Sequence, residues 1–482
     1  MQRTIIFLVL ALTVVLSCVA TAQQSEGSRI ISRFTYPTLT WSVPEVGREV
    51  RREVLDNGMI LYLMENHRLP ILDATAMIHC GYAYEPIEKM ALPDIAATVM
   101  RTGGTAAIGP DSLNTVLEMI GGSLETTVRD ESCQATLSVM AKDTELGFSL
   151  LSDMLRNPTF PEDKIELKKT QLKTNIRRRN DNPESILGRE FYHLIYGDHP
   201  SGRVLEWKFV APITRQELVD YHHRYFIPNN MILGITGDFD AEEMIALVKK
   251  YFGDWSKANV SLPEIPKVKD APRPGVYQVF KEIDQTGIRF GGLGIDRNSP
   301  DRYAVQIMNY ILGGGSFASR MTSKVRSDEG LSYSVGTTFE TSTRDRGVWY
   351  AFCQTKSQTT YKAMDLMLNE VKRIRDGYVD DEELESAKDR YINQFVFDFA
   401  TPSQIVNRLM ELEFYSRPPD LLKNFINNIR KVTKEDVRGV AQTYLKPEDI
   451  TFVVIGNPEK FEKPLSDFGT VNDINLEDPV VE

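Results

Sequence analysis

Two stretches of the chain repeat the same order of polar and apolar positions, 219 residues apart. Residues 213–237 run ITRQELVDYHHRYFIPNNMILGITG, and residues 432–456 run VTKEDVRGVAQTYLKPEDITFVVIG. In each copy a Thr followed three positions later by an acidic residue is typical of a helix start. A Pro then interrupts the helix, and an apolar run ending in Gly predicts a strand. The same offset aligns residues 160–169 with residues 379–388, so the pattern predicts two copies of one unit.

The apolar runs MILYLMEN at 59–66 and ILDATAMIHCGYAYEP at 71–86 predict that the first copy opens with strands, before its helices. Between the copies, residues 255–276 contain four prolines, which is typical of a semi-rigid extended linker. The expected fold is therefore α+β, with two homologous α/β sandwich domains arranged as a clamshell whose interface encloses a ligand site. The predicted division is a signal peptide at 1–22, an extension at 23–48, an N-terminal domain at 49–257, a linker at 258–274, a C-terminal domain at 275–470 and a tail at 471–482.

The N-terminus has the pattern of an export signal. Arg3 precedes an apolar run at 5–16, and Ala-Thr-Ala ending at Ala22 supplies small residues for cleavage. We therefore expect an exported, periplasmic protein. The VLSC sequence ending at Cys18 leaves a lipoprotein, acylated at that thiol, as the alternative. No later stretch is long and apolar enough to predict a transmembrane segment in the mature chain.

Composition narrows the choice of partner. Of the 482 residues 42% are hydrophobic and 26% are charged, which is ordinary for a globular protein. The formal net charge of −11 argues against a nucleic-acid partner, because phosphate binding needs a dense basic surface. The three cysteines Cys80, Cys133 and Cys353 are odd in number and have no metal-binding spacing, so we expect buried, unreactive thiols on strands.

The segment ALPDIAATVMRTGGT at 91–105 predicts a helix, with Pro93 in its first turn and Gly-Gly at its end. One face of this helix carries Asp94, Ala97 and Thr98 and has no histidine. None of the six histidines in the chain has a second histidine four residues away beside a Glu. The residues alone therefore predict a structural helix.

Taken together, several stretches in this order and spacing resemble the M16 metallopeptidase family, the group of pitrilysin, insulinase and mitochondrial processing peptidase. They extend from residue 55 to the closing strand at 450–459 and are LDNGM, GYAYEP, TGGT, RNDNP, YGDHPSGR, YFIPNNMILGITGDFD, YILGGGSFASRM and VRSDEGLSY. The resemblance implies two LuxS/MPP-like domains.

The resemblance also implies where zinc would bind. Active members carry H-x-x-E-H on the first helix, with two His ligands and a Glu base, and a further Glu ligand on a later helix. In this chain the motif positions are Asp94, Ala97 and Thr98, and the later Glu position falls at Asn175. A single carboxylate does not make a zinc site, so we expect no metal or other cofactor on this chain.

The second domain retains another part of the family pattern. Arg326 and Tyr333 stand in the R-x-x-x-G-L-x-Y context that, in two-chain members, holds the substrate carbonyl and the developing oxyanion. Without the resemblance, a surface ion pair and a strand-face tyrosine would be the ordinary interpretation. Gly313, Gly314 and Gly315, followed by Ser316 and Phe317, predict a flexible loop after a helix, with a substrate-guiding role implied by the family and a simple helix cap as the alternative.

The resulting hypothesis is a chain that is inactive alone and serves as the co-catalytic subunit of an exported zinc peptidase acting on peptides. Its partner would be an H-x-x-E-H subunit of the same family, which would carry the zinc in a heterodimer. A non-enzymatic peptide-binding or scaffold protein of the cell envelope is the alternative. An independent enzyme using Asp94 is a third hypothesis, which no Ser-His or Cys-His pattern supports.

Overall fold

The structure is a computed structural model and describes residues 42–481. The predictions of a signal peptide at 1–22 and of acylation at Cys18 lie outside the described residues. From Pro44 onward the chain forms one compact unit. Within the described residues no helix has the length and apolar character needed to cross a bilayer.

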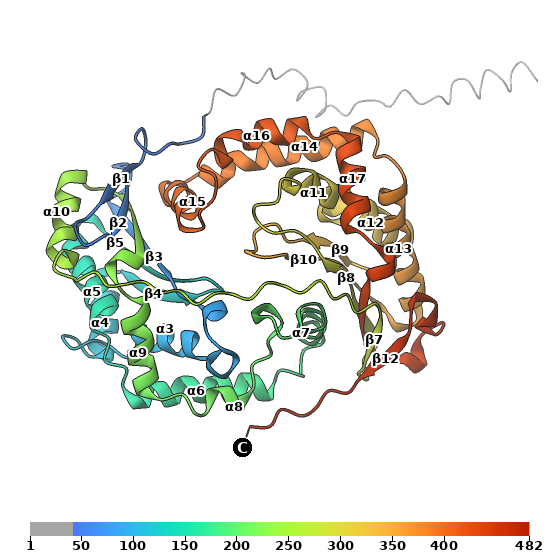
Figure 1. The fold of residues 1–482 in the computed structure, drawn as a ribbon, viewed down its shortest axis with the longest axis horizontal. Coiled ribbons are helices and arrows are strands. Elements are labelled where there is room, and N and C mark those ends of the chain that lie inside the picture. Colours follow the sequence, from blue (N-terminus) through green and yellow to red (C-terminus); the bar gives the residue numbers. More distant parts are fainter. Residues whose placement is uncertain (1–41, 482) are drawn as a thin grey trace, which may run out of the picture. The chain divides into compact units, whose positions relative to one another are not determined.

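Two six-stranded mixed sheets form the framework of this unit (Figure 1). The first has the order β1-β2-β6-β3-β5-β4 and the second the order β12-β7-β11-β8-β10-β9. The strands are β1 (Arg51–Val54), β2 (Ile60–Glu65), β3 (Ile71–His79), β4 (Ser123–Val128), β5 (Ser132–Met140), β6 (Met231–Gly237), β7 (Gly275–Phe280), β8 (Gln285–Leu293), β9 (Ser334–Phe339), β10 (Val348–Lys356), β11 (Thr451–Gly456) and β12 (Val471–Ile474). In both sheets the last strand of the repeat, β6 or β11, lies parallel to one neighbour and antiparallel to the other.

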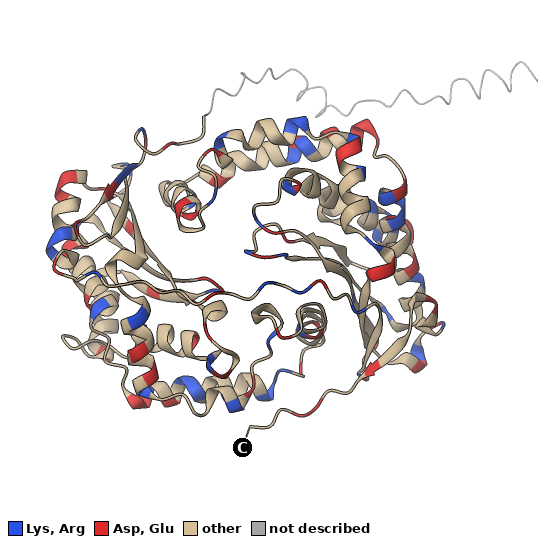
Figure 2. Cartoon of the chain, viewed as in Figure 1, with Lys and Arg blue, Asp and Glu red and all other residues tan. Residues whose placement is uncertain are grey.

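Helices pack against both sheets. Those of the first half are α3 (Leu92–Thr102), α4 (Pro110–Ile120), α5 (Thr144–Arg156), α6 (Glu162–Arg177), α7 (Pro183–Tyr196), α8 (Trp207–Val210), α9 (Arg215–Tyr225) and α10 (Ala241–Phe252). Those of the second half are α11 (Arg302–Asn309), α12 (Arg320–Thr322), α13 (Thr360–Asp376), α14 (Asp381–Phe395), α15 (Pro402–Phe414), α16 (Leu421–Lys431) and α17 (Lys434–Tyr444). Acidic and basic residues are interspersed along these helices (Figure 2).

The predicted repeat is confirmed at the level of single hydrogen bonds. Thr214 and Glu217 form a complete capping box at the start of α9, and Thr433 and Asp436 form the same box at the start of α17. Each box satisfies two backbone N–H groups that the first helical turn leaves without a partner. The polar pattern that marked the repeat therefore marks the same helix end in both halves.

The two halves exchange one helix each. The apolar face of α7, with Ile186, Leu187 and Phe191, forms a core with Val453 and Ile455 of the second sheet. An ion pair of 2.5 Å between Glu184 and Arg289 of β8 fixes the start of α7.

The reciprocal helix, α15, covers the first sheet. Gly234 of β6 has no room for a Cβ atom, because Val406 and Met410 of α15 occupy that space. Glu413 of α15 accepts hydrogen bonds from Arg52 of β1 and from the hydroxyl of Tyr62. The helices α7 and α15 are corresponding elements of the repeat, so the exchange is mutual. The domains predicted at 49–257 and 275–470 describe the repeat along the sequence, whereas in the packed structure each sheet is covered by one helix of the other half.

Two predicted boundaries need correction, whereas the linker is as expected. The first strand run ends at His79, since Gly81 adopts a φ of 136° and a short 3-10 turn at Tyr82–Tyr84 follows. Residues 471–474, assigned to a tail, form β12 and pair with β7, so the second sheet extends beyond residue 470. The linker region at 256–274 has no helix or strand.

Candidate functional site

Helix α3 forms where the sequence predicted a helix, and most of its residues are buried. Pro93 lies in its first turn, Asp94 is near its N-terminus, and its backbone ends at Gly103. Ile95 and Val99 are fully buried in the first core. Ala97 is buried too, and its carbonyl accepts a hydrogen bond from the hydroxyl of Thr126 on β4.

A lysine occupies the space beside the carboxylate at the first motif position. The Nζ atom of Lys168, on α6, lies 2.8 Å from Oδ2 and 3.0 Å from Oδ1 of Asp94. Thr98, one turn later on α3, donates to Asp94 at 3.4 Å. Both partners of the ion pair are largely shielded, with 15% of the Lys168 side chain and 31% of the Asp94 side chain exposed. The only acid of the motif positions is therefore neutralised from within the chain.

The residue at the later motif position takes no part in this ion pair. Asn175 lies on α6, two turns beyond Lys168, and its side chain is exposed. Among residues 42–481 no group of three or more His, Cys, Asp or Glu side chains is arranged to hold a metal ion. Sequence reasoning missed Lys168, although its spacing of seven residues from Asn175 places both on one face of α6.

Cavities border α3. One of about 400 Å³ is lined by Tyr82, Asp94, Asp130 and Tyr196, among others. It adjoins a larger one of about 1080 Å³, which shares Tyr82, Asp130 and Tyr196. Burial raises the pKa of Asp130 above its usual value, and the charge of Glu131 raises it further.

The larger cavity has charged walls of both signs. Arg297, after β8, donates to both carboxylate oxygens of Glu131, between β4 and β5, at 2.8 Å. These side chains are only 8% and 13% exposed. Arg344 approaches the same carboxylate at 3.4 Å, and the Arg297 guanidinium lies 4.6 Å from the Tyr415 ring centre. This charge network joins the two sheets at the cavity wall.

The structure brings Arg326 and Tyr333 together. Arg326 lies in a π-helical turn (Ser323–Asp328), and Gly330, with a φ of 63°, reverses the chain toward β9. The Arg326 guanidinium lies 4.4 Å from the ring centre of Phe317 and 5.7 Å from that of Tyr333, and it donates to the Tyr333 carbonyl at 3.2 Å. Tyr333 is 90% exposed and Phe317 is 65% exposed. The arginine is thus held between two rings that face solvent.

The glycines before this cluster differ from the prediction. Tyr310–Gly314 continue α11 as a π-helical turn, so the segment is not a flexible loop there. Gly313 is buried, and a Cβ atom on it would lie 2.5 Å from the backbone nitrogen of Thr337. The turn over Ser316–Ala318 follows, with Ser316 at a φ of 52°. Gly313 allows a close helix-to-strand contact, and the substrate role of this glycine segment stays a prediction.

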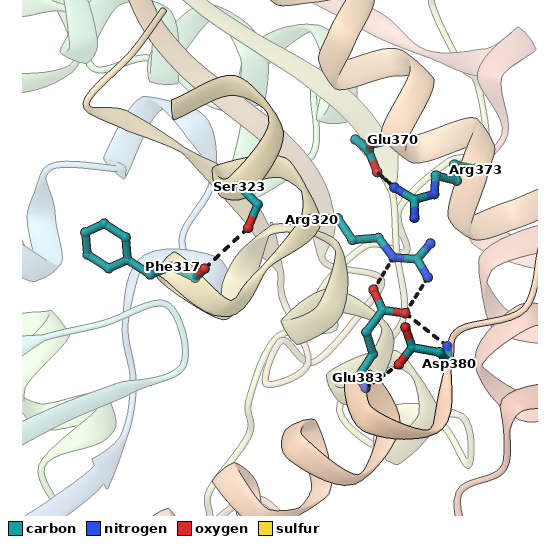
Figure 3. A network of polar contacts seen from close by, with 7 residues as sticks. All are labelled: Phe317, Arg320, Ser323, Glu370, Arg373, Asp380 and Glu383. Atoms are coloured by element: carbon teal, nitrogen blue, oxygen red, sulfur yellow. Dashed lines mark hydrogen bonds and ion pairs between the residues drawn. The ribbon is translucent and has the colours of Figure 1, made fainter. Parts of the chain in front are cut away.

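A polar network anchors the segment that carries Phe317 (Figure 3). Arg320, which is buried, donates to both oxygens of Glu383 at 2.5 and 2.6 Å. Burial alone would raise the pKa of Glu383, but hydrogen bonds from Arg320 and from the Asp380 backbone lower it below its usual value. Ser323 donates to the Phe317 carbonyl at 3.4 Å. The turn is therefore tied to the N-terminus of α14.

The cysteine prediction is confirmed in part. Cys80, Cys133 and Cys353 are free and buried. Cys133 lies on β5 and Cys353 on β10, but Cys80 follows the end of β3. Burial raises the pKa of Cys353 to about 11, which keeps that thiol protonated and unreactive.

Comparisons with known proteins identify the family. Residues 74–206 match the family described as Insulinase (Peptidase family M16), and residues 212–391 match the one described as Peptidase M16 inactive domain. A Mycobacterium leprae protein named an uncharacterized zinc protease is 30% identical over 226 residues, which are 45% of this chain and only 50% of that relative.

Two further relatives cover more of the chain. A Helicobacter pylori protein named non-peptidase homolog YmxG is 22% identical over 82% of this chain and 91% of its own length. A solved M16 inactive-domain structure from Pseudomonas fluorescens shares the fold with a TM-score of 0.76 at 23% identity, covering 85% of this chain and 98% of that one. Both halves of the repeat thus match one family, and the chain belongs to the M16 peptidase family.

Proposed function

We propose that this chain is the non-catalytic subunit of a two-chain, exported zinc metalloendopeptidase that acts on peptides in the periplasm. The partner is an M16 subunit with H-x-x-E-H, which carries the zinc and the general base. This chain supplies Arg326 and Tyr333, whose guanidinium and hydroxyl bind the substrate carbonyl and the oxyanion that forms during hydrolysis.

The observation that supports this proposal most is the contrast between the two motif regions. At the zinc motif positions, Asp94 is neutralised by Lys168. At the second region, Arg326 is oriented by Phe317 and Tyr333, and the Tyr333 side chain is almost fully exposed. An arginine held in place by its neighbours loses little conformational entropy when it binds a substrate oxygen, so a ready donor pair without its own metal fits a co-catalytic role.

The test is reconstitution with the partner that copurifies with the tagged chain. Removing one oxyanion donor typically lowers kcat about 10²- to 10³-fold. We expect Arg326→Ala and Tyr333→Phe to lower kcat of the assembled pair to that extent and to leave assembly, followed by size-exclusion chromatography, unchanged.

A second Arg–Tyr pair on the same half provides a matched control. Arg438 lies over the ring of Tyr378 at 4.9 Å, and Tyr378 is 54% exposed. The substitution Tyr378→Phe removes an exposed hydroxyl from a similar setting, and we expect it to leave kcat unchanged. Wild-type kcat in both Arg326→Ala and Tyr333→Phe would contradict the assigned roles.

The second candidate function is non-enzymatic peptide binding in the cell envelope, which the cavity of about 1080 Å³ favours. This function predicts that the purified chain binds peptides in the absence of any partner and that no H-x-x-E-H protein copurifies. A stoichiometric zinc subunit in the copurified material would decide against it.

A further inference from the structure

A smaller cavity of about 270 Å³ adjoins the large one in the second half of the chain. Ser342, Arg408 and Arg417 line both, so the smaller cavity is a side pocket of the larger. Its walls come from α11, α14, α15 and α16.

Two arginines in this side pocket have no acidic partner. Arg302 begins α11, and Arg417 follows the end of α15. Among the described side chains, none with a carboxylate lies within 4.0 Å of either guanidinium, and the Nε atom of each is buried without a hydrogen-bond partner. The Arg417 side chain donates a hydrogen bond of 3.4 Å to the carbonyl of Arg297.

The acids nearby already have a partner. Asp398 and Glu411 line the side pocket, but both bind Arg408, at 3.1 and 3.5 Å. Three arginines therefore face two carboxylates, which leaves the pocket with an excess positive charge. Burial, with the neighbouring charges of Arg302 and Arg297, lowers the pKa of Arg417 to about 10.

Such an arrangement costs free energy in the empty protein. Arg302 and Arg417 are partly exposed, but the Nε donor of each is buried without a partner, and a buried donor without a hydrogen bond is costly. A bound carboxylate offsets that cost, because it accepts parallel N–H bonds from guanidinium groups. The pocket therefore has the charge of a carboxylate-binding site.

The rest of the wall specifies what carries the carboxylate. Leu412, Leu421, Leu422 and Phe425 line the same pocket. Gln306, one turn after Arg302, has a buried amide oxygen without a partner, and the opposite amide orientation would present its NH₂ group as a further donor. Donors beside an apolar wall suit a carboxylate attached to an apolar group, because a small inorganic anion would bind the arginines but leave the apolar wall uncovered.

We propose that this side pocket binds the C-terminal carboxylate of a peptide whose last side chain is apolar, through Arg302 and Arg417. The proposal rests on the peptide-handling function above and adds the end of the peptide that is recognised. It makes no use of Arg326, Tyr333 or a metal.

The test is isothermal titration calorimetry on the full mature chain without a partner. The probes are acetyl-Ala-Ala-Phe with a free carboxylate, the same peptide with a C-terminal amide, and inorganic phosphate. We expect the acid to bind at least about 10-fold more tightly than the amide, because the amide loses the charge-assisted bonds. Equal affinity of acid and amide, or saturable binding of phosphate alone, would overturn the proposal.

Substitutions then separate this pocket from general stability. Arg417→Met and Arg302→Met should abolish the preference for the acid and should raise the Tm of the free chain, since each removes an unpaired charge and keeps apolar volume. Arg438→Met, outside the pocket, is the control and should retain the preference. A lowered Tm in Arg417→Met would show that the arginine stabilises the fold, and an unchanged preference would show that it does not bind the carboxylate; either result would contradict the proposal.

The two proposals fail separately. If the acid peptide does not bind, the pocket assignment is wrong, while the kcat test of Arg326 and Tyr333 is unaffected. If those two variants have wild-type kcat, the co-catalytic role is wrong, while binding to the isolated chain is unaffected.

Discussion

Grafting the family's zinc ligands onto α3 and α6 tests whether the charge of Lys168 opposes cation binding at this position. The graft is Asp94→His, Thr98→His and Asn175→Glu, with and without Lys168→Ala. Ala97 is left unchanged, because the motif Glu acts as a base and is not a ligand, and because a Glu would be buried there.

The magnitude follows from the position of the ammonium group. The Lys168 Nζ is 2.8 Å from the Asp94 carboxylate, so an ion bound by a His at that position would lie within about 5 Å of it. A dication and a single positive charge about 5 Å apart repel by about 7 kcal/mol at an effective dielectric constant of about 20. Since the lysine side chain is 15% exposed and can move toward solvent, part of this repulsion is relieved. We expect about 3 kcal/mol to persist, which is about a 100-fold difference in Kd.

The assay is zinc binding by competition with a chromophoric chelator, with folding checked by circular dichroism. The three-residue graft with Lys168→Ala should bind zinc about 100-fold more tightly than the graft that keeps Lys168. Lys164→Ala, on the same helix, is the matched control and should leave the zinc Kd of the graft unchanged. Equal Kd values with and without Lys168 would refute the electrostatic reasoning.

Two further predictions concern stability. Gly313→Ala should lower the free energy of unfolding by about 1–3 kcal/mol, because its Cβ atom would press on the Thr337 backbone. Gly439→Ala in α17 is the control: its Cβ atom meets no atom within 4 Å, so it should raise the free energy of unfolding by about 0.5–1 kcal/mol. Equal Tm shifts in the two variants would contradict this reasoning. His79 is stacked on Phe414 at 3.7 Å, and burial lowers its pKa to about 4. Between about pH 6.5 and 4 the histidine is therefore protonated in the unfolded chain and neutral in the folded chain. The free energy of unfolding should fall by up to about 3 kcal/mol as the pH falls over this range. His79→Phe keeps the stacked ring and should flatten the fall of Tm over that pH range; a slope equal to that of the wild type would show that His79 does not titrate as described.

Local chemistry explains why much of the fold could be predicted. The capping boxes at Thr214 and Thr433 and the strands that end at Gly237 and Gly456 depend on residues a few positions apart. The absence of histidines from α3 can also be read directly from the sequence. The resemblance to the M16 family then identified Arg326 and Tyr333, which lie in contact across one short turn in the structure.

Contacts between distant segments could not be predicted in this way. An amphipathic pattern shows that α7 and α15 each bury a face, but it does not show that each covers the sheet of the other half. The same limit applies to Asp94 and Lys168, which are 74 residues apart. The glycines at 313–315 predicted a loop, whereas Gly313 and Gly314 lie in a helical turn and Gly313 packs closely against β9.

The sequence by itself determined the repeated unit, its helix ends and strands, and the loss of the zinc ligands, because hydrogen bonds and side-chain periodicity act over a few residues. Only the tertiary structure decided which sheet each exchanged helix covers, which cation neutralises Asp94, and that Arg302 and Arg417 share a pocket without an acid. Burial and Coulomb interactions depend on distance in space, and no local pattern encodes that distance.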